Sequence, residues 1–110
     1  MKDYPKPIKK LIRQYAGIAH EEELRRALVP LAAKFDEWRV GSLSSGELSD
    51  AIHEFHNGPS RELFKTYNEP APLDMAVAYA IATGVLDDKS MERPLLELLV
   101  PAIQFYRQNS

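Results

Sequence analysis

The sequence predicts an all-α protein, folded as a compact bundle of five to six helices within a single domain. Apolar residues recur at spacings of three and four along most of the chain, which is the period of one helix face. No stretch shows the alternating pattern of a β-strand. At 110 residues the chain has the usual size of one domain, so we expect residues 1–110 to form one unit.

Two helices are expected in the first 40 residues. After an extended basic segment over residues 1–7, the first helix should begin beyond Pro7. Gly17 predicts a break or bend near His20. The acidic residues 21–23 suit the positive end of a second helix dipole. Pro30 predicts a kink within that helix, and Gly41 its end. Its apolar seam predicts packing along a neighbouring helix and comprises Leu24, Leu28, Leu31, Phe35 and Trp38.

A helical hairpin is expected over residues 44–67. Ser44 and Glu47 have the spacing of a capping box, which satisfies the free amides at a helix start. That helix should run to about Asn57, with Gly58 as its left-handed terminator. Pro59 should then open a short helix that ends at Tyr67.

The last two helices follow a loop over residues 68–72. The stretch LDMAVAYAIATG is apolar almost all round, which predicts a central helix surrounded by others. Within it Ala76, Ala80 and Gly84 form a strip of small side chains along which another helix could approach closely. Pro94 fits the first turn of the last helix, and Pro101 predicts a bend in it.

Composition and charge limit the classes of function that the chain can have. The chain has no cysteine, which excludes disulfides and thiolate sites. No signal peptide and no membrane span is predicted, so we expect a cytoplasmic protein without a membrane partner. Because the net charge is only −2, we expect no nucleic-acid partner. Residues 1–13 carry a local charge of +4 and residues 40–90 a local charge of −5, so these surfaces could meet within one chain or across a dimer.

Two histidines in the hairpin raise the question of a metal or anion site. Asp50 and His53 have the carboxylate-x-x-His spacing with which one helix can supply two metal ligands, and His56 is close enough to join them. The helical wheel, however, places Asp50 and His53 opposite the apolar face and His56 on its border, which favours ordinary surface residues. A second alternative is an anion held by His56 and Arg61 beside the Gly58–Pro59 turn.

A further pair, Arg13 and His20, is separated by six residues. This spacing resembles the Arg-x4–6-His motif of HEPN domains, which are small all-α ribonuclease toxins. The resemblance covers that spacing and the size class alone. It implies an RNA-cleaving activity that depends on His20.

These observations lead to three functional hypotheses. No phosphate-binding loop, nucleophile elbow or His-Glu-x-x-His motif is present, so we expect a non-enzymatic interaction or regulatory module that self-associates and needs no cofactor. The alternative is a metal- or anion-binding, hydrolytic protein that uses residues 50–61 and a divalent metal ion. The third hypothesis is the HEPN-like ribonuclease.

Overall fold

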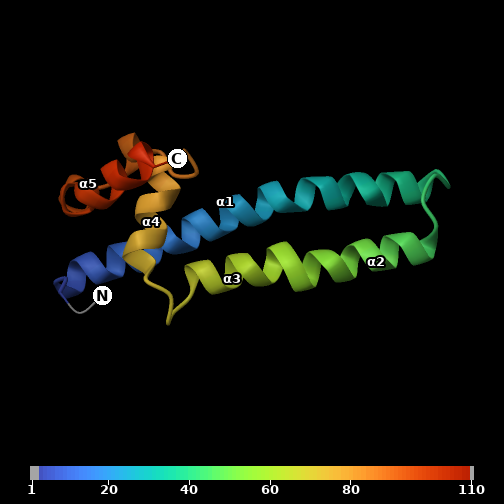
Figure 1. Ribbon diagram of the computed structural model, residues 1–110, viewed down its shortest axis with the longest axis horizontal. Coiled ribbons are helices and arrows are strands. Elements are labelled where there is room, and N and C mark those ends of the chain that lie inside the picture. Colours follow the sequence, from blue (N-terminus) through green and yellow to red (C-terminus); the bar gives the residue numbers. More distant parts are fainter. Residues whose placement is uncertain (1–2, 110) are drawn as a thin grey trace.

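The computed structural model describes residues 3–109 of the chain. Within this range every regular element is helical and none is a strand, which confirms the all-α class (Figure 1). The α-helices are α1 (Lys6–Arg39), α2 (Ser45–Phe55), α3 (Arg61–Tyr67), α4 (Leu73–Ala82) and α5 (Arg93–Gln108). A π-helical segment, η1 (His56–Ser60), joins α2 to α3, and a short 3₁₀ segment, η2 (Asp88–Ser90), precedes α5.

The predicted count of five to six helices is not matched exactly, because α2, η1 and α3 join end to end. The described residues therefore form four helical rods: α1, α2–η1–α3, α4 and α5. The break expected near His20 is absent, and α1 is one helix of 34 residues. Gly17 lowers helix propensity by only about 1 kcal/mol relative to alanine. Packing outweighs this cost, since Ile12, Tyr15 and Ala16 on the adjoining turns are buried against the rest of the core.

The second expected break, at Gly58, is absent as well. Positive φ angles occur in the described residues only at Gly41 and Gly84, so Gly58 is not the left-handed terminator that the sequence predicted. Instead the chain passes through η1, and α2, η1 and α3 form one continuous rod. Pro59 lies inside η1 and lacks an amide hydrogen, so a regular α-helical bond pattern is impossible there. The wider π turn carries the helix past the proline.

The hydrophobic core lies at one end of the molecule, where the first half of α1 meets α3, α4 and α5 (Figure 1). On α4, Val77, Ala78 and Ala80 have no exposed surface, in agreement with the predicted central helix. The largest fully buried side chains come from three helices and are Ile12, Leu95, Leu99 and Val77. We call this region the core end.

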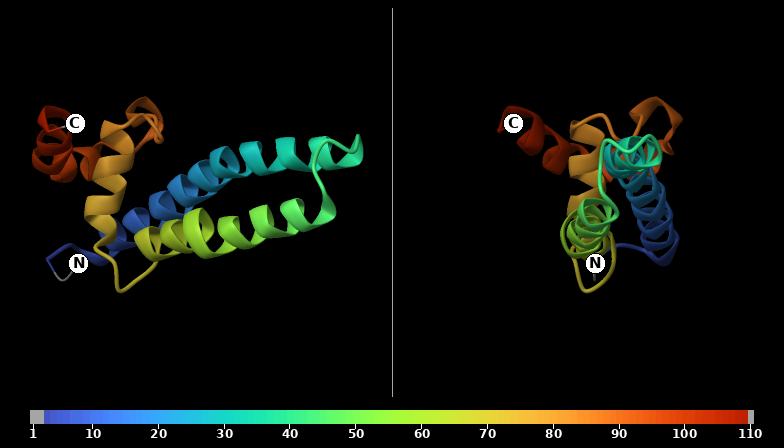
Figure 2. Two further views of the ribbon diagram at one scale, coloured as in Figure 1. Left: turned by 45° about the vertical axis from the view of Figure 1, so that its right-hand side comes forward. Right: turned by 90° about the vertical axis from the view of Figure 1, so that its right-hand side faces the viewer.

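The remainder of α1 and α2–η1 form a long antiparallel hairpin that extends away from the core end (Figure 2). We call residues 21–60 the arm. The molecule measures 53 × 25 × 24 Å, and its radius of gyration is 17.2 Å. A compact domain of this length has a radius of gyration of about 13 Å, so the arm makes the molecule elongated. Between residues 20 and 66, Leu48 is the only buried side chain.

The extended basic segment expected over residues 1–7 falls partly outside the described residues, which begin at residue 3. Pro5 is the N-cap of α1, and the helix begins at Lys6. The Tyr4 hydroxyl donates a hydrogen bond of 3.0 Å to Oδ2 of Asp74 on α4, and the Tyr4 side chain packs against the core. Burial, followed by this contact with Asp74, raises the pKa of Tyr4 above its ordinary value.

Candidate functional site

The predicted capping box begins α2 at the tip of the arm. The Glu47 amide donates to the Ser44 side chain over 3.1 Å, and the Ser44 amide donates to Glu47 Oε1 over 3.1 Å. The bond from the Ser44 amide favours the ionised carboxylate and lowers the pKa of Glu47. The local signal thus fixes where α2 starts, and with it the direction in which the histidines further along point.

The three residues considered as metal ligands, Asp50, His53 and His56, are all exposed. The His53 ring nitrogen Nε2 lies 3.0 Å from Asn57 Nδ2, so this nitrogen is already engaged in a hydrogen bond along the helix. Over residues 3–109, no group of three or more potential ligands is arranged to hold a metal ion. Metal binding by these residues stays a prediction, and it would require ligands from a second molecule.

The anion site considered at His56 and Arg61 depended on a turn between two helices. Because η1 continues the helix, the residues around Ser60 have helical angles and no separate helix start lies beside Arg61. Both side chains are exposed, and no hydrogen bond or ion pair joins them among the described contacts. Anion binding there therefore rests on the two side chains alone and stays a prediction.

Arg13 and His20, in contrast, are brought together by the continuity of α1. Both line a cavity of about 220 Å³ together with Gly17, Tyr67, Asn68, Glu69 and Leu73. The His20 ring stacks on the Tyr67 ring with a centroid distance of 5.8 Å and an interplanar angle of 20°. Nε of Arg13 forms an ion pair of 3.1 Å with Oε1 of Glu69. The arginine charge in this cavity is thus already balanced by a carboxylate.

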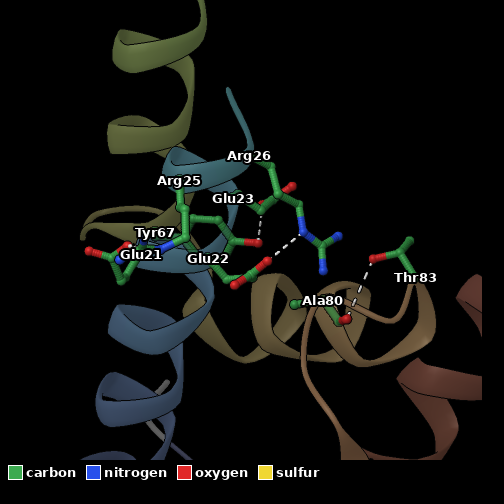
Figure 3. A network of polar contacts seen from close by, with 8 residues as sticks. All are labelled: Glu21, Glu22, Glu23, Arg25, Arg26, Tyr67, Ala80 and Thr83. Carbon is green, nitrogen blue, oxygen red and sulfur yellow. Dashed lines mark hydrogen bonds and ion pairs between the residues drawn. The ribbon is translucent and has the colours of Figure 1, made fainter. Parts of the chain in front are cut away.

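Tyr67 links this cavity to the base of the arm. Its side chain is buried, and its hydroxyl donates a short hydrogen bond to Oε2 of Glu23 on α1 (Figure 3). Burial raises the pKa of Tyr67 well above its ordinary value, and the bond to Glu23 is the second cause of this rise. The neighbouring Glu22 accepts from Nε of Arg26 over 2.6 Å on the same helix.

A groove between the two rods of the arm has a volume of about 320 Å³. Both prolines that interrupt regular helical bonding, Pro30 in α1 and Pro59 in η1, lie in its wall. The other lining residues are mostly apolar and comprise Ala27, Leu31, Ala51 and Phe55, with Lys34 and Glu54.

Large apolar side chains are exposed at both ends of the molecule. On the arm and its tip they are Leu28, Val29, Trp38, Val40 and Ile52, with exposed fractions of 41%, 64%, 41%, 78% and 41%. At the core end Tyr79 and Phe105 are 50% and 55% exposed and both make edge-on contacts with the Tyr106 ring. Exposed apolar side chains are typical of a binding surface where they form a contiguous patch.

Sequence reasoning did not find the exposure of the arm. The seam of the second predicted helix, which ends at Trp38, was expected to pack along a neighbouring helix. At Trp38 this packing is incomplete, because the Trp38 side chain is 41% exposed and its indole Nε1 donates to Ser45 Oγ over 3.0 Å. The sequence carries no signal for this exposure, because periodicity shows which face of a helix is apolar and not what covers it.

Comparisons with known proteins give no functional assignment: no family model, no curated protein and no solved structure matches this chain. Among residues 3–109, no helix combines the length and the apolarity that crossing a bilayer requires. The function must therefore be inferred from the geometry of the chain itself.

Proposed function

We propose that the protein is a non-enzymatic helical interaction module that self-associates, and that it acts in the cytoplasm. The observation that carries the proposal is the arm. It extends an amphipathic hairpin away from the core, buries one side chain, Leu48, and exposes five large apolar ones. Burying apolar surface contributes roughly 25 cal/mol per Å², so a partner that covers the arm gains stabilisation that the isolated chain lacks.

The division of charge along the sequence supports self-association less than the arm does. The basic start of α1 meets the acidic segment within one chain, through the Arg13–Glu69 ion pair. The Tyr4–Asp74 hydrogen bond makes a second contact between the same regions. The basic and acidic regions are thus partly paired within one chain, so the proposal rests on the apolar surface of the arm.

Native mass spectrometry of the untagged protein over a concentration series tests the proposal. We expect a dimer whose population rises with concentration, and the same spectra report any metal retained in stoichiometric amount. A chain that stays monomeric at every concentration and binds no protein partner would contradict the proposal. A dimer that retains metal would favour a site shared between subunits at His53 and His56, in place of a purely structural interface.

One observation favours a second candidate function, the ribonuclease. The sequence placed a break between Arg13 and His20, whereas the uninterrupted α1 puts both residues in the wall of one cavity. Supporting it, the His20 ring is held by stacking on Tyr67. Against it, Glu69 neutralises Arg13. An assay for RNA cleavage decides: activity lost in His20→Ala supports this candidate, and the absence of cleavage by the native protein removes it.

A further inference from the structure

The exposed side of α1 in the arm carries a stripe of six residues at heptad spacing. They follow one another at intervals of three and four and are Glu22, Arg25, Val29, Ala32, Asp36 and Arg39. On a helical wheel they fall within about 50° of one line, the width of a seam between two paired helices. This stripe is distinct from the predicted seam that faces α2.

The order of charges in the stripe is self-complementary under reversal. A second α1 that runs antiparallel, with a two-fold axis between residues 30 and 31, places each residue opposite one of complementary chemistry. Glu22 then faces Arg39, Arg25 faces Asp36, and Val29 faces Ala32, and each pairing occurs twice. Antiparallel coiled coils align their heptad positions in this way, and a two-fold interface is self-complementary by construction.

The opposite orientation is disfavoured by the same residues. In a parallel pair in register, each residue of the stripe faces its own copy, so Glu22, Arg25, Asp36 and Arg39 would all meet like charges. Like charges placed against each other across an interface are repulsive and suppress that arrangement. The stripe thus selects one orientation and one register.

The side chains of the stripe are available for this pairing. The side-chain exposed fractions are 74% for Arg25, 74% for Asp36 and 66% for Arg39, while Glu22 is 38% exposed. Their present partners lie on α1 itself: Arg25 is 3.6 Å from Glu21, and Arg39 is 3.0 Å from Asp36. Exposed pairs of this kind contribute little to stability, so exchanging them for contacts across an interface costs little.

The centre of the stripe provides the apolar contact. Val29 is 64% exposed and Leu28, beside it, is 41% exposed. Both residues, with Ala32, line a surface hollow of about 320 Å³. In the antiparallel register Val29 faces Ala32 of the second copy, so a larger side chain meets a small one. Small residues opposite large ones allow two helices to approach closely.

We propose that the second copy of this chain binds along the stripe, antiparallel to α1, with Val29 and Ala32 at the centre and two Arg25–Asp36 pairs beside them. This inference rests on the proposed self-association and names its surface. It predicts a two-fold dimer with the two core ends at opposite extremes of an elongated particle.

Two charge reversals test the pairing. Arg25→Glu alone and Asp36→Arg alone each turn two opposite-charge contacts into like-charge contacts, so each should weaken self-association by at least about tenfold. In a mixture of the two variants, every position 25 again faces an opposite charge at position 36. Native mass spectrometry of the mixture should therefore show a heterodimer, while each variant alone is mostly monomeric.

A matched control places a reversal on the other side of the same helix. Lys34→Glu changes a residue in the groove between the rods, away from the stripe, and should leave self-association within about twofold of the native value. Far-ultraviolet circular dichroism checks that all variants keep their helices. Hydrogen exchange of the native protein gives a second measurement that needs no variant: residues 22–39 should exchange more slowly at dimeric than at monomeric concentrations.

The outcomes separate this inference from the proposed function. A native dimer that both reversals leave intact, or that slows exchange on α4 and α5 in place of α1, overturns the stripe and leaves self-association standing. Variants that become monomeric but form no heterodimer overturn the register. A native protein that is monomeric throughout overturns both the inference and the proposed function.

Discussion

The core end and the arm are both helical but bury very different fractions of their residues. At the core end α4 is covered by α1 and α5, and Val77, Ala78 and Ala80 are fully buried. In the arm, two rods lie side by side and nothing covers their outer surfaces, so Leu48 alone is buried. A pair of helices can cover one face of each, whereas a third helix is needed to enclose a core. We therefore expect the core end to be the more stable part, and the proposed function assigns the outer surface of the arm to a partner.

The largest expected effect is the loss of a core side chain compared with an equivalent loss in the arm. Leu95→Ala removes a fully buried side chain and should lower the free energy of unfolding by about 2–5 kcal/mol. Ile52→Ala, at a position that is 41% exposed, should lower it by less than about 1 kcal/mol. Urea denaturation followed by circular dichroism measures both. Equal losses would mean that Ile52 is covered in solution, for example by a bound partner.

A smaller effect is expected at the junction of the two regions, where Tyr67 on α3 donates to Glu23 on α1. Tyr67→Phe removes the hydrogen bond to a partly buried carboxylate and should lower the free energy of unfolding by about 1–2 kcal/mol. Chemical denaturation at neutral pH gives this value. A change near zero would show that Glu23 is fully hydrated without its partner and that the junction is held by packing alone.

The same tyrosine predicts a dependence on alkaline pH. Since the fold raises the pKa of Tyr67, the native state keeps the phenol neutral where the unfolded chain, with a pKa of about 10, ionises. The associated stability is present in full below pH of about 10 and is lost as the pH rises further. Tyr4 has a raised pKa as well and should contribute in the same direction. Stability measured from pH of about 8 to 11 should fall less steeply in Tyr67→Phe than in the native protein.

At the tip of the arm, Ser44→Ala should remove the capping box and destabilise the start of α2 by about 1 kcal/mol. Because the arm has few buried side chains, we expect faster hydrogen exchange of the first α2 amides with little change in global unfolding. Ser42→Ala, in the adjacent exposed loop, is the matched control and should leave those amides unchanged. Faster exchange in both variants would trace the effect to the loop and would argue against a specific cap.

The elements that the sequence predicted well are those set by local chemistry. The capping box at Ser44, the central position of α4 and the proline in the first turn of α5 each follow from a few adjacent residues. The two breaks that the sequence placed at Gly17 and Gly58 do not occur. Glycine lowers helix propensity at those positions, but contacts made far away in the chain decide whether the helix continues.

The exposed surface of the arm was harder to predict for a related reason. Periodicity reveals which face of a helix is apolar but not what covers it, so the seam from Leu24 to Trp38 predicted a neighbouring helix but not how much of the seam stays exposed. The juxtaposition of Arg13 and His20 was likewise obscured by the expected break between them. The stripe from Glu22 to Arg39 can be read from the sequence alone, but it gains meaning only once α1 is known to be one uninterrupted, exposed helix.

The smallest expected effect concerns the ion pair between Arg13 and Glu69, which joins the start of α1 to the loop before α4. Both side chains are more than half exposed, at 54% and 58%, so water and salt screen their attraction. Arg13→Gln should therefore lower the free energy of unfolding by less than about 0.5 kcal/mol, and a double-mutant cycle with Glu69→Gln should give a coupling of similar size. Denaturation at low and at high salt measures both, and the small coupling should vanish at high salt. A coupling clearly above 1 kcal/mol that survives high salt would mean that the cavity around Arg13 excludes water in solution. An enclosed arginine beside His20 would then favour the ribonuclease candidate over a purely structural pair at that end of the molecule.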